Sequence, residues 1–205
     1  MSVGRLILLR HGRTPWNDDG RLQGQTDVPL DDVGRAQARA AASALAPLRP
    51  ALVVSSDLVR ARDTAQVLAD AAGAPLRLDA RLRERDFGAW EGLIGAEIEE
   101  GWPEAYAAWR QGDEPGEMAA EPRSAVGRRV IAAIEEAAAG LDPRDLLVVV
   151  GHGGALSTAM TAALGMSPGE WFGVRAMDNG RWSLLESNPR TPPAWRLRRH
   201  DVGPG

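Results

Sequence analysis

Short runs of apolar residues recur along the chain at spacings that predict the strands of one sheet. Each run is bounded by polar or turn-forming residues, and most are rich in leucine and valine, which is typical of buried strands in parallel sheets. We expect strands over residues 6–9, 51–55, 75–78, 146–150, 182–186 and 195–198.

Between these runs, apolar residues recur every three or four positions, which predicts amphipathic helices. We expect helices over residues 32–45, 58–71, 124–139 and 155–164. Ser56 or Asp57 is expected to cap the second of these helices and Gly73 to end it. Because strands and helices alternate, the sequence predicts an α/β fold: a three-layer α/β/α sandwich with a mostly parallel six-stranded sheet.

The stretch from about residue 92 to residue 123 departs from this alternation. Trp102, Tyr106 and Trp109 follow one another at helical spacing, and residues 112–117 read GDEPGE. We interpret the stretch as a small helical cap followed by a mobile loop, inserted into a single domain that spans residues 1–205. An aromatic stripe of this kind is expected to serve packing rather than ligand binding.

Composition excludes several kinds of chemistry. The chain has 205 residues, a formal net charge of -4 and no cysteine, and all 24 of its Lys+Arg residues are arginine. Thiolate nucleophiles, disulfides, Schiff bases and the phosphate-loop lysine are therefore absent, and a zinc cluster is not expected. Neither a nucleic-acid partner nor a membrane span is indicated, and without a signal-peptide pattern we expect a soluble cytoplasmic protein.

Two of the three histidines occupy equivalent places in this predicted fold. His11 follows the first strand, and His152 follows the strand over residues 146–150 inside the sequence Gly-His-Gly-Gly. The carboxyl ends of parallel strands lie at one edge of a sheet, where binding sites form. We therefore expect the two imidazole rings to lie close together, whereas His200, in an arginine-rich terminal strand, is expected to be solvated.

Charged residues follow other strands at the same edge. Arg10 directly precedes His11, and Arg60 lies in the first turn of a predicted helix, where a cation opposes the helix dipole. An anionic ligand would remove this conflict. Glu84 follows the strand over residues 75–78, and its spacing to the next glycine favours it over Asp86 and Glu91 as the carboxylate at this edge. We expect Glu91 to brace the loop instead.

Four segments, in this order, resemble the motifs of the histidine phosphatase superfamily, the fold group of cofactor-dependent phosphoglycerate mutase. Residues 9–17 read LRHGRTPWN and are followed by Gln23 and Gly24, which is similar to the opening signature of that family. Residues 55–65 resemble its second arginine motif, residues 82–92 its acid motif, and residues 150–154, VGHGG, its second histidine motif. The resemblance covers nearly the whole chain.

This resemblance implies a metal-independent phosphomonoester hydrolase that needs no cofactor. His11 would attack phosphorus and become phosphohistidine, and Glu84 would protonate the leaving oxygen and then accept a proton from the attacking water. The phosphoryl oxygens would be held by arginine, imidazole and neutral donors. These donors are Arg10, Arg60, His152, Asn17, Gln23 and the Gly153 N–H.

The acid motif and the short cap favour a phosphatase over a mutase. The sequence resembles actinobacterial glucosyl-3-phosphoglycerate phosphatases through residues 20–25, 55–58 and 177–182, although residues 120–124, AEPRS, depart from the Gly-Glu-Ser of many relatives. The expected partner is thus a small phosphorylated metabolite, either glucosyl-3-phosphoglycerate or a broad range of esters. A cofactor-dependent phosphoglycerate mutase and a non-catalytic phospho-ligand binding module are the alternatives. A homodimer is common among similar proteins, but no exposed stripe identifies an interface.

Overall fold

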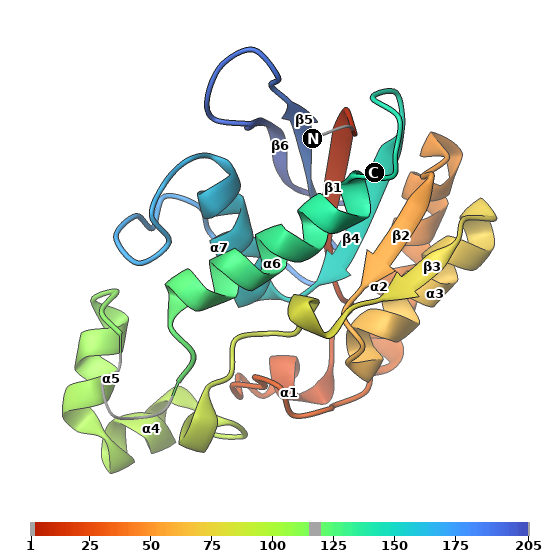
Figure 1. Cartoon of the computed structure of the whole chain (residues 1–205). Helices are drawn as coiled ribbons and strands as arrows, with labels where there is room; N and C mark the ends of the chain where they lie inside the picture. The colour runs from red at the N-terminus through yellow and green to blue at the C-terminus, as the bar shows by residue number, and fades with distance from the viewer. Residues whose placement is uncertain (1–2, 115–119, 205) are drawn as a thin grey trace.

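A six-stranded sheet forms the centre of the protein, which is described from a computed structural model covering residues 3–114 and 120–204. The strands lie in the order β3-β2-β4-β1-β5-β6 (Figure 1). Strands β3, β2, β4 and β1 are mutually parallel, β5 runs antiparallel to β1, and β6 runs antiparallel to β5. Their bounds are β1 (Arg5–Arg10), β2 (Leu52–Ser55), β3 (Leu76–Leu78), β4 (Leu146–Gly151), β5 (Trp182–Ser187) and β6 (Trp195–Val202).

Each predicted strand is present, and the largest difference is at the C-terminal end of β6. This strand continues to Val202, which pairs with Trp182 of β5. The sequence obscures the extension because residues 196–201 are mostly charged. An edge strand with exposed charges carries little apolar signal, although its backbone still pairs with its neighbour.

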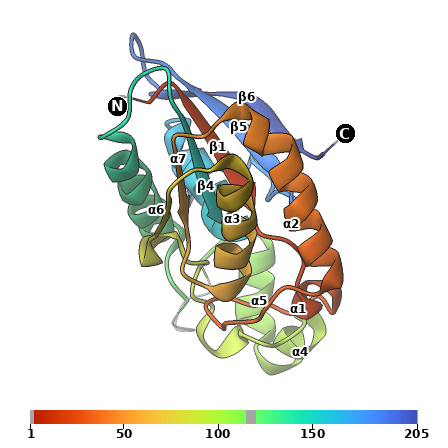
Figure 2. The ribbon, with the colours of Figure 1, turned by 90° about the vertical axis from the view of Figure 1, so that its right-hand side faces the viewer.

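Helices cover both faces of the sheet, which confirms the predicted three-layer α/β/α architecture. Figure 2 shows α2 and α3 on one side of the strands and α6 on the other. The four long helices are α2 (Asp32–Leu45), α3 (Val59–Ala72), α6 (Arg123–Ala138) and α7 (Gly153–Ala163). Alternating residues of the strands face the two helical layers, because successive side chains of a strand point to opposite faces.

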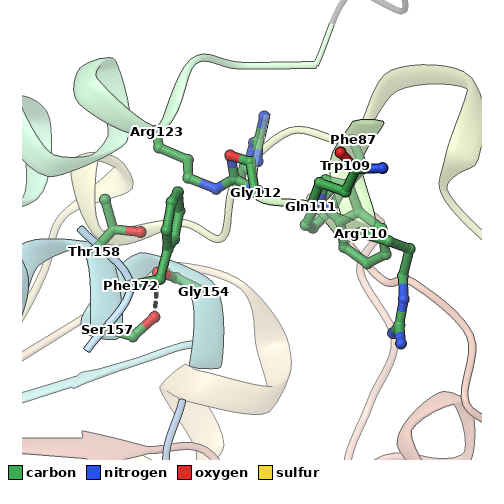
Figure 3. Close-up of a pocket in the computed structure, with 11 residues that line it drawn as sticks. Phe87, Trp109, Arg110, Gln111, Gly112, Arg123, Gly154, Ser157, Thr158 and Phe172 are labelled. Atoms are coloured by element: carbon green, nitrogen blue, oxygen red, sulfur yellow. Dashed lines mark hydrogen bonds between the residues drawn. The ribbon is translucent and has the colours of Figure 1, made fainter. Parts of the chain in front are cut away.

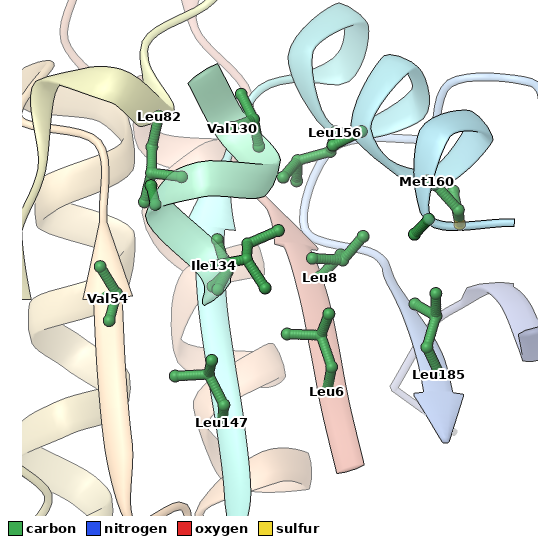
Figure 4. Close-up of a cluster of buried hydrophobic side chains, with 14 of the residues drawn as sticks. Leu6, Leu8, Val54, Leu82, Val130, Ile134, Leu147, Leu156, Met160 and Leu185 are labelled. Atoms are coloured by element: carbon green, nitrogen blue, oxygen red, sulfur yellow. The ribbon is translucent and has the colours of Figure 1, made fainter. Parts of the chain in front are cut away.

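The first strand illustrates this alternation. Leu6 and Leu8 belong to the apolar cluster beneath α6 and α7, where Ile134 and Leu156 also lie (Figure 4). The intervening Ile7 belongs to the cluster beneath α2 and α3. Strand β1 is thus buried on both faces, which positions the residues that follow it at the edge of a rigid sheet.

Helix α3 begins without the predicted cap. Its N-cap residue is Leu58, and the side chain that accepts a hydrogen bond from the N–H of Val59 is Asp27, at 2.7 Å. The prediction of Ser56 or Asp57 as the cap was therefore wrong, because a residue distant in the sequence supplies the acceptor. The helix does end at Gly73, whose φ of 63° is the left-handed conformation that glycine adopts readily.

The stretch that begins at about residue 92 contains helices, as predicted, and lies away from the sheet at the lower left of Figure 1. It contains α4 (Gly95–Gly101) and α5 (Pro103–Arg110). The ring centroids of Tyr106 and Trp109 lie 6.5 Å and 5.8 Å from that of Trp90, so these two members of the aromatic stripe do serve packing. The loop predicted over residues 112–117 lies partly outside the described residues.

Several short elements escaped the sequence pattern. They are α1 (Pro15–Asp18) and the 3-10 turns η1 (Ala46–Leu48), η2 (Ala80–Leu82) and η3 (Gly88–Trp90). A single turn is too short to show apolar periodicity. None of the helices in the described part of the chain has the length and apolar character that crossing a bilayer requires.

Candidate active site

His11 lies immediately after β1 and is almost fully buried, with 2% of its surface exposed. Its Nδ1 lies 2.6 Å from the carbonyl oxygen of Gly12. A carbonyl only accepts, so Nδ1 carries the proton and Nε2 presents a lone pair. Burial, followed by the nearby charges of Arg60 and Arg10, holds the pKa of His11 well below its usual range. The imidazole is therefore neutral and nucleophilic at Nε2.

His152 follows β4 and precedes α7, as the sequence predicted, and its ring lies beside that of His11. The ring centroids are 5.1 Å apart and the planes make an angle of 61°. Arg60 donates from Nε to Nδ1 of His152 across 3.2 Å. Nε2 of His152 therefore carries the proton, and this buried N–H has no partner among the described residues. Burial and then Arg60 lower the pKa of His152 as well.

Two arginines complete the charged part of the site. Arg10 donates from Nη1 to the carbonyl of Met177 at 2.6 Å, and its Nε is buried without a partner in the described chain. Arg60 donates from Nη1 and Nη2 to the carbonyls of Thr26 and Gly24, both at 2.8 Å. Burial lowers the pKa of Arg60 to about 10, which leaves it a cation at neutral pH.

The positive charge of Arg10 and Arg60 is not balanced by a direct ion pair. Among residues 3–114 and 120–204, no carboxylate lies within 4.0 Å of either guanidinium group. Burying a charge without a counterion is costly. Arg60 is buried and Arg10 is half-buried, so this pair of cations is suited to an anion that supplies the missing charge.

Glu84 reaches this site from the loop between η2 and η3. Its two carboxylate oxygens accept from the N–H groups of Gly154, at 2.9 Å, and Ala155, at 2.7 Å, at the start of α7. A Cβ on residue 154 would lie 2.8 Å from Oε1 of Glu84, so the approach depends on glycine at this position. The unpaired N–H groups and the dipole of a helix N-terminus favour a carboxylate there.

Three neutral donors lie around the same space. The side-chain oxygen of Asn17 accepts from the N–H of Thr14 at 3.2 Å, and that of Gln23 accepts from the Thr14 hydroxyl at 2.9 Å. Both amides thus have their NH₂ groups left to donate. The N–H of Gly153, the first residue of α7, has no partner among the described residues.

These groups surround a cavity of about 200 Å³. Seven of the eight residues predicted from the sequence line it, and the eighth, His152, lies beside His11. The lining residues are Arg10, His11, Asn17, Arg21, Leu22, Gln23, Gly24, Arg60, Glu84, Phe87, Gly153, Gly154 and Ala176. A neutral imidazole, a carboxylate and two unpaired cations in one small cavity are suited to transfer of a phosphoryl group.

Glu91 braces the neighbouring loop, as the sequence predicted. Its carboxylate accepts from the N–H groups of Gln25, at 2.8 Å, and Thr26, at 3.0 Å. It also accepts from the Thr26 hydroxyl at 2.7 Å. The loop that carries the Gly24 and Thr26 carbonyls, and through them Arg60, is thereby fixed.

Sequence reasoning missed two residues that hold the site together. Arg129 of α6 donates to the carbonyls of Arg83, at 2.7 Å, and Glu84, at 2.9 Å. Asn179 donates from Nδ2 to the carbonyl of His11 at 3.1 Å and to the side-chain oxygen of Asn17 at 3.2 Å. Neither position carries a signal of its own, although Asn179 lies in a segment that resembles the motifs of related phosphatases.

His200 differs from expectation. It is partly buried rather than solvated, and its Nδ1 forms a 2.8 Å hydrogen bond with the hydroxyl of Ser183. The cause is the pairing of β6 with β5, which brings the two side chains to the same face. Within the described parts of the chain, no three His, Asp or Glu side chains are grouped so that they could hold a metal ion.

Comparison with known proteins agrees with this geometry. The family model of the histidine phosphatase superfamily (branch 1) matches residues 6–200. The glucosyl-3-phosphoglycerate phosphatase of Mycolicibacterium vanbaalenii is 40% identical over 198 residues, which cover 93% of this chain and 87% of the relative.

Solved structures give the same result. A mycobacterial glucosyl-3-phosphoglycerate phosphatase in complex with VO3 superposes with a TM-score of 0.88 and 37% identity, covering 98% of this chain and 100% of the other. The alpha-ribazole phosphatase from Shigella flexneri gives a TM-score of 0.80 and 28% identity, covering 97% and 96%. The chain therefore belongs to the histidine phosphatase superfamily, branch 1, and is a phosphatase of that superfamily.

Proposed function

We propose that this phosphatase hydrolyses small phosphomonoesters without a metal, through a phosphohistidine formed on His11. The observation that carries the proposal is the meeting of two cations that lack an ion pair, the half-buried Arg10 and the buried Arg60, with two imidazoles in opposite tautomers. His11 offers a lone pair at Nε2, and His152 offers an N–H at Nε2. One ring can thus attack phosphorus while the other donates to a phosphoryl oxygen.

In the first step, the Nε2 lone pair of His11 attacks phosphorus and a P–N bond forms. The bond from phosphorus to the ester oxygen breaks, and Glu84 gives its proton to that oxygen, so that the alcohol leaves neutral. In the second step, a water molecule attacks phosphorus and gives a proton to Glu84. The P–N bond then breaks and its electron pair returns to Nε2, which regenerates the enzyme.

The surrounding donors stabilise the transition state of both steps. Arg10 and Arg60 are held by backbone carbonyls, so their remaining N–H groups are oriented before the substrate arrives. Such preorganised donors lower the barrier without reorganisation at the moment of reaction. The His152 Nε2–H, the amides of Asn17 and Gln23 and the Gly153 N–H supply the neutral hydrogen bonds.

Glucosyl-3-phosphoglycerate is the first candidate substrate. The support comes from the relative at 40% identity and from the mycobacterial structure at 37%, both of which are glucosyl-3-phosphoglycerate phosphatases by name. That second structure holds VO3, a stand-in for the phosphoryl group, which suits a cavity with this set of donors. Other small phosphomonoesters belong to the same class of substrate, and the test below compares them.

The proposal is tested by incubating the protein with p-nitrophenyl phosphate in excess chelator. We expect phosphate release by the wild type, and loss of turnover by His11→Ala, because no other described side chain places a neutral nucleophile in the cavity. Acid-labile, base-stable radiolabel from ³²P-substrate should appear on the wild type alone. Turnover by His11→Ala would contradict the covalent scheme, and binding without turnover by the wild type would indicate a non-catalytic module.

A substrate panel resolves the remaining alternatives. It contains glucosyl-3-phosphoglycerate, 3-phosphoglycerate and phosphoserine, each assayed for phosphate release. The 3-phosphoglycerate sample is also assayed for isomerisation, with and without a bisphosphate primer. Hydrolysis without isomerisation supports the phosphatase, whereas primer-dependent isomerisation would identify a mutase. A strong preference for the glucosyl ester would establish the substrate.

A further inference from the structure

A second and larger cavity, of about 440 Å³, adjoins the first. We call it the leaving-group cavity. Phe87 and Gly154 line both cavities, so the two spaces adjoin at these residues. Figure 3 shows the leaving-group cavity between the start of α6, the end of α5 and the segment after α7, with Arg123 and Phe172 on one side and Trp109 and Arg110 on the other.

The chemistry of the first cavity directs the substrate alcohol toward this space. In-line attack by His11 expels the leaving oxygen on the side of phosphorus opposite the imidazole. Glu84, which must protonate that oxygen, is hydrogen-bonded to the N–H of Gly154 at 2.9 Å. The leaving group therefore emerges beside Gly154 and Phe87, where the two cavities meet.

The lining of the leaving-group cavity is positively charged. It includes Arg85, Arg110 and Arg123, and none of the described residues that line it is acidic. Glu114 lies nearby, hydrogen-bonds to Arg85 and lies 3.7 Å from Arg123, so one carboxylate is shared between these two arginines. The remaining charge is an excess of cation, which favours an anionic ligand.

The hydrogen bonds of the two inner arginines leave N–H groups available. Arg85 uses Nε for the carbonyl of Glu121 and Nη2 for Glu114, and Arg123 uses Nη1 for the carbonyls of Gly112 and Asp113. Within the described chain, Nη1 of Arg85 and both Nε and Nη2 of Arg123 have no hydrogen-bond partner. The pair Nε and Nη2 is the edge of a guanidinium that binds a carboxylate with two parallel hydrogen bonds.

Aromatic rings orient both guanidinium groups. Arg85 lies over the ring of Phe87 at 5.5 Å from its centroid, and Arg123 lies over the ring of Phe172 at 5.3 Å. Phe172 is 53% exposed and lines the cavity, so part of its surface is open to a ligand. A guanidinium that lies over an aromatic face keeps its N–H edges accessible.

We propose that the leaving-group cavity binds the alcohol portion of the substrate and that Arg123, assisted by Arg85, recognises a carboxylate on it. The preferred substrates are then phosphomonoesters of hydroxycarboxylic acids, and Arg123 is a specificity-determining residue. This inference rests on the proposed phosphatase function. It also gives a role to residues 120–124 (AEPRS), which lead into α6 and contain Arg123.

The test uses two pairs of substrates that differ by one carboxylate. These are 3-phosphoglycerate with glycerol 3-phosphate, and phosphoserine with phosphoethanolamine. The quantity compared is the ratio of kcat/KM within each pair. For the wild type we expect a ratio of at least about tenfold in favour of the substrate that carries the carboxylate. For Arg123→Met we expect this ratio to fall by about tenfold or more, because one charge-assisted hydrogen-bonded contact contributes a factor of that size.

Arg128→Met is the matched control, since Arg128 is exposed on the same helix and does not line the cavity. Its ratio should equal that of the wild type. A wild-type ratio near one, or an Arg123→Met variant that loses the same factor on both members of a pair, would overturn the inference. Failure of the wild type to hydrolyse p-nitrophenyl phosphate is a different result, because it would contradict the proposed phosphatase function itself.

Discussion

Arg60 donates from Nε to Nδ1 of His152 across 3.2 Å, and this contact gives His152 the tautomer opposite to that of His11. An arginine N–H only donates, so the acceptor nitrogen cannot carry a proton, whereas Nδ1 of His11 must carry one to reach the carbonyl of Gly12 at 2.6 Å. Two rings with centroids 5.1 Å apart therefore present different groups to the same cavity, one lone pair and one N–H.

This arrangement predicts a spectroscopic result. In ¹⁵N-labelled protein at neutral pH, long-range ¹H–¹⁵N spectra should show His11 protonated at Nδ1 and His152 protonated at Nε2. The chain has three histidines, so the signals can be assigned by substitution. Two rings of the same tautomer, or a charged His11, would contradict the nucleophilic role.

Removal of the Arg60 side chain should affect both tautomer and rate. In Arg60→Met, His152 loses the donor that fixes Nδ1 as an acceptor, so its signals should indicate a mixture of tautomers. Turnover should fall by about 10² to 10³-fold, the range for loss of one preorganised transition-state donor. The exposed Arg128→Met serves as the control. Wild-type turnover in Arg60→Met would show that this cation does not contact the phosphoryl group.

Burial of both histidines predicts that stability falls in mild acid. Burial lowers the pKa of His11 and of His152, whereas in the unfolded chain each has a pKa near 6.5. Between about pH 6.5 and the lowered pKa of these histidines in the folded state, the unfolded state binds protons that the folded state does not. The free energy of unfolding therefore decreases as pH falls, by about 1.4 kcal/mol per pH unit for each such histidine, and is unaffected by these groups above about pH 7.5.

The measurement is urea unfolding of phosphate-free protein between about pH 5 and about pH 7.5. His152→Asn has one buried imidazole fewer, so its stability should depend less steeply on pH than that of the wild type. Identical slopes for the two proteins would show that His152 does not remain neutral in the fold.

The sequence predicted the main elements and most of the cavity lining because both depend on local pattern. Apolar runs mark the strands, and parallel strands bring the residues after them to one edge, which is how Arg10, His11 and Glu84 come together with Gly153. Each of these residues ends or follows a strand or begins a helix, so its place in the fold can be inferred from its neighbours in the chain.

The remainder depends on contacts between distant segments. Asp27 caps α3, and Arg129 binds carbonyls that precede it by more than 40 residues. No periodicity distinguishes Arg129 among 24 arginines. The leaving-group cavity is lined by the loop after η2, by parts of α5, α6 and α7, and by Phe172. A cavity made by five separate segments has no signature in any one of them.

Arg129 is expected to act as a positioning residue for the catalytic loop. It donates to the carbonyls of Arg81 and Arg83, both at 2.7 Å, and of Glu84, at 2.9 Å, while its Nε is paired with Glu121 at 2.6 Å. Arg129→Met removes these bonds and frees the loop that carries the proposed acid. We expect kcat for an alkyl phosphate to fall by about 10² fold, the lower range for general acid catalysis.

The comparison that isolates positioning uses two leaving groups. p-Nitrophenolate leaves readily without a proton, so its ester should lose much less activity in Arg129→Met than an alkyl ester does. Arg128→Met should change neither. Equal losses on both esters would indicate a general structural defect rather than displacement of Glu84.

Gly34 links helix α2 to the loop that carries the nucleophile. A Cβ on residue 34 would lie 2.0 Å from the carbonyl oxygen of Arg13, and a Cβ on residue 12 would lie 2.3 Å from the carbonyl oxygen of Gly34. The two backbones therefore pack directly on each other. Gly34→Ala must displace the loop, and with it the Gly12 carbonyl that orients His11. We expect a loss of about 1–3 kcal/mol in the free energy of unfolding, and about 10² fold in kcat, since small misplacement of a reacting group is costly.

Gly101→Ala provides the matched control, because residue 101 ends helix α4 and a Cβ there would meet nothing within 4 Å. Alanine is the better helix former, so this substitution should leave stability unchanged or raise it by up to about 1 kcal/mol. Intrinsic helix propensity would favour alanine at Gly34 as well. If close packing dominates at Gly34, the two substitutions therefore change the free energy of unfolding in opposite directions. If Gly34→Ala instead matches Gly101→Ala in urea unfolding and in turnover, then the loop tolerates the added methyl group, and the orientation of His11 does not depend on its contact with α2.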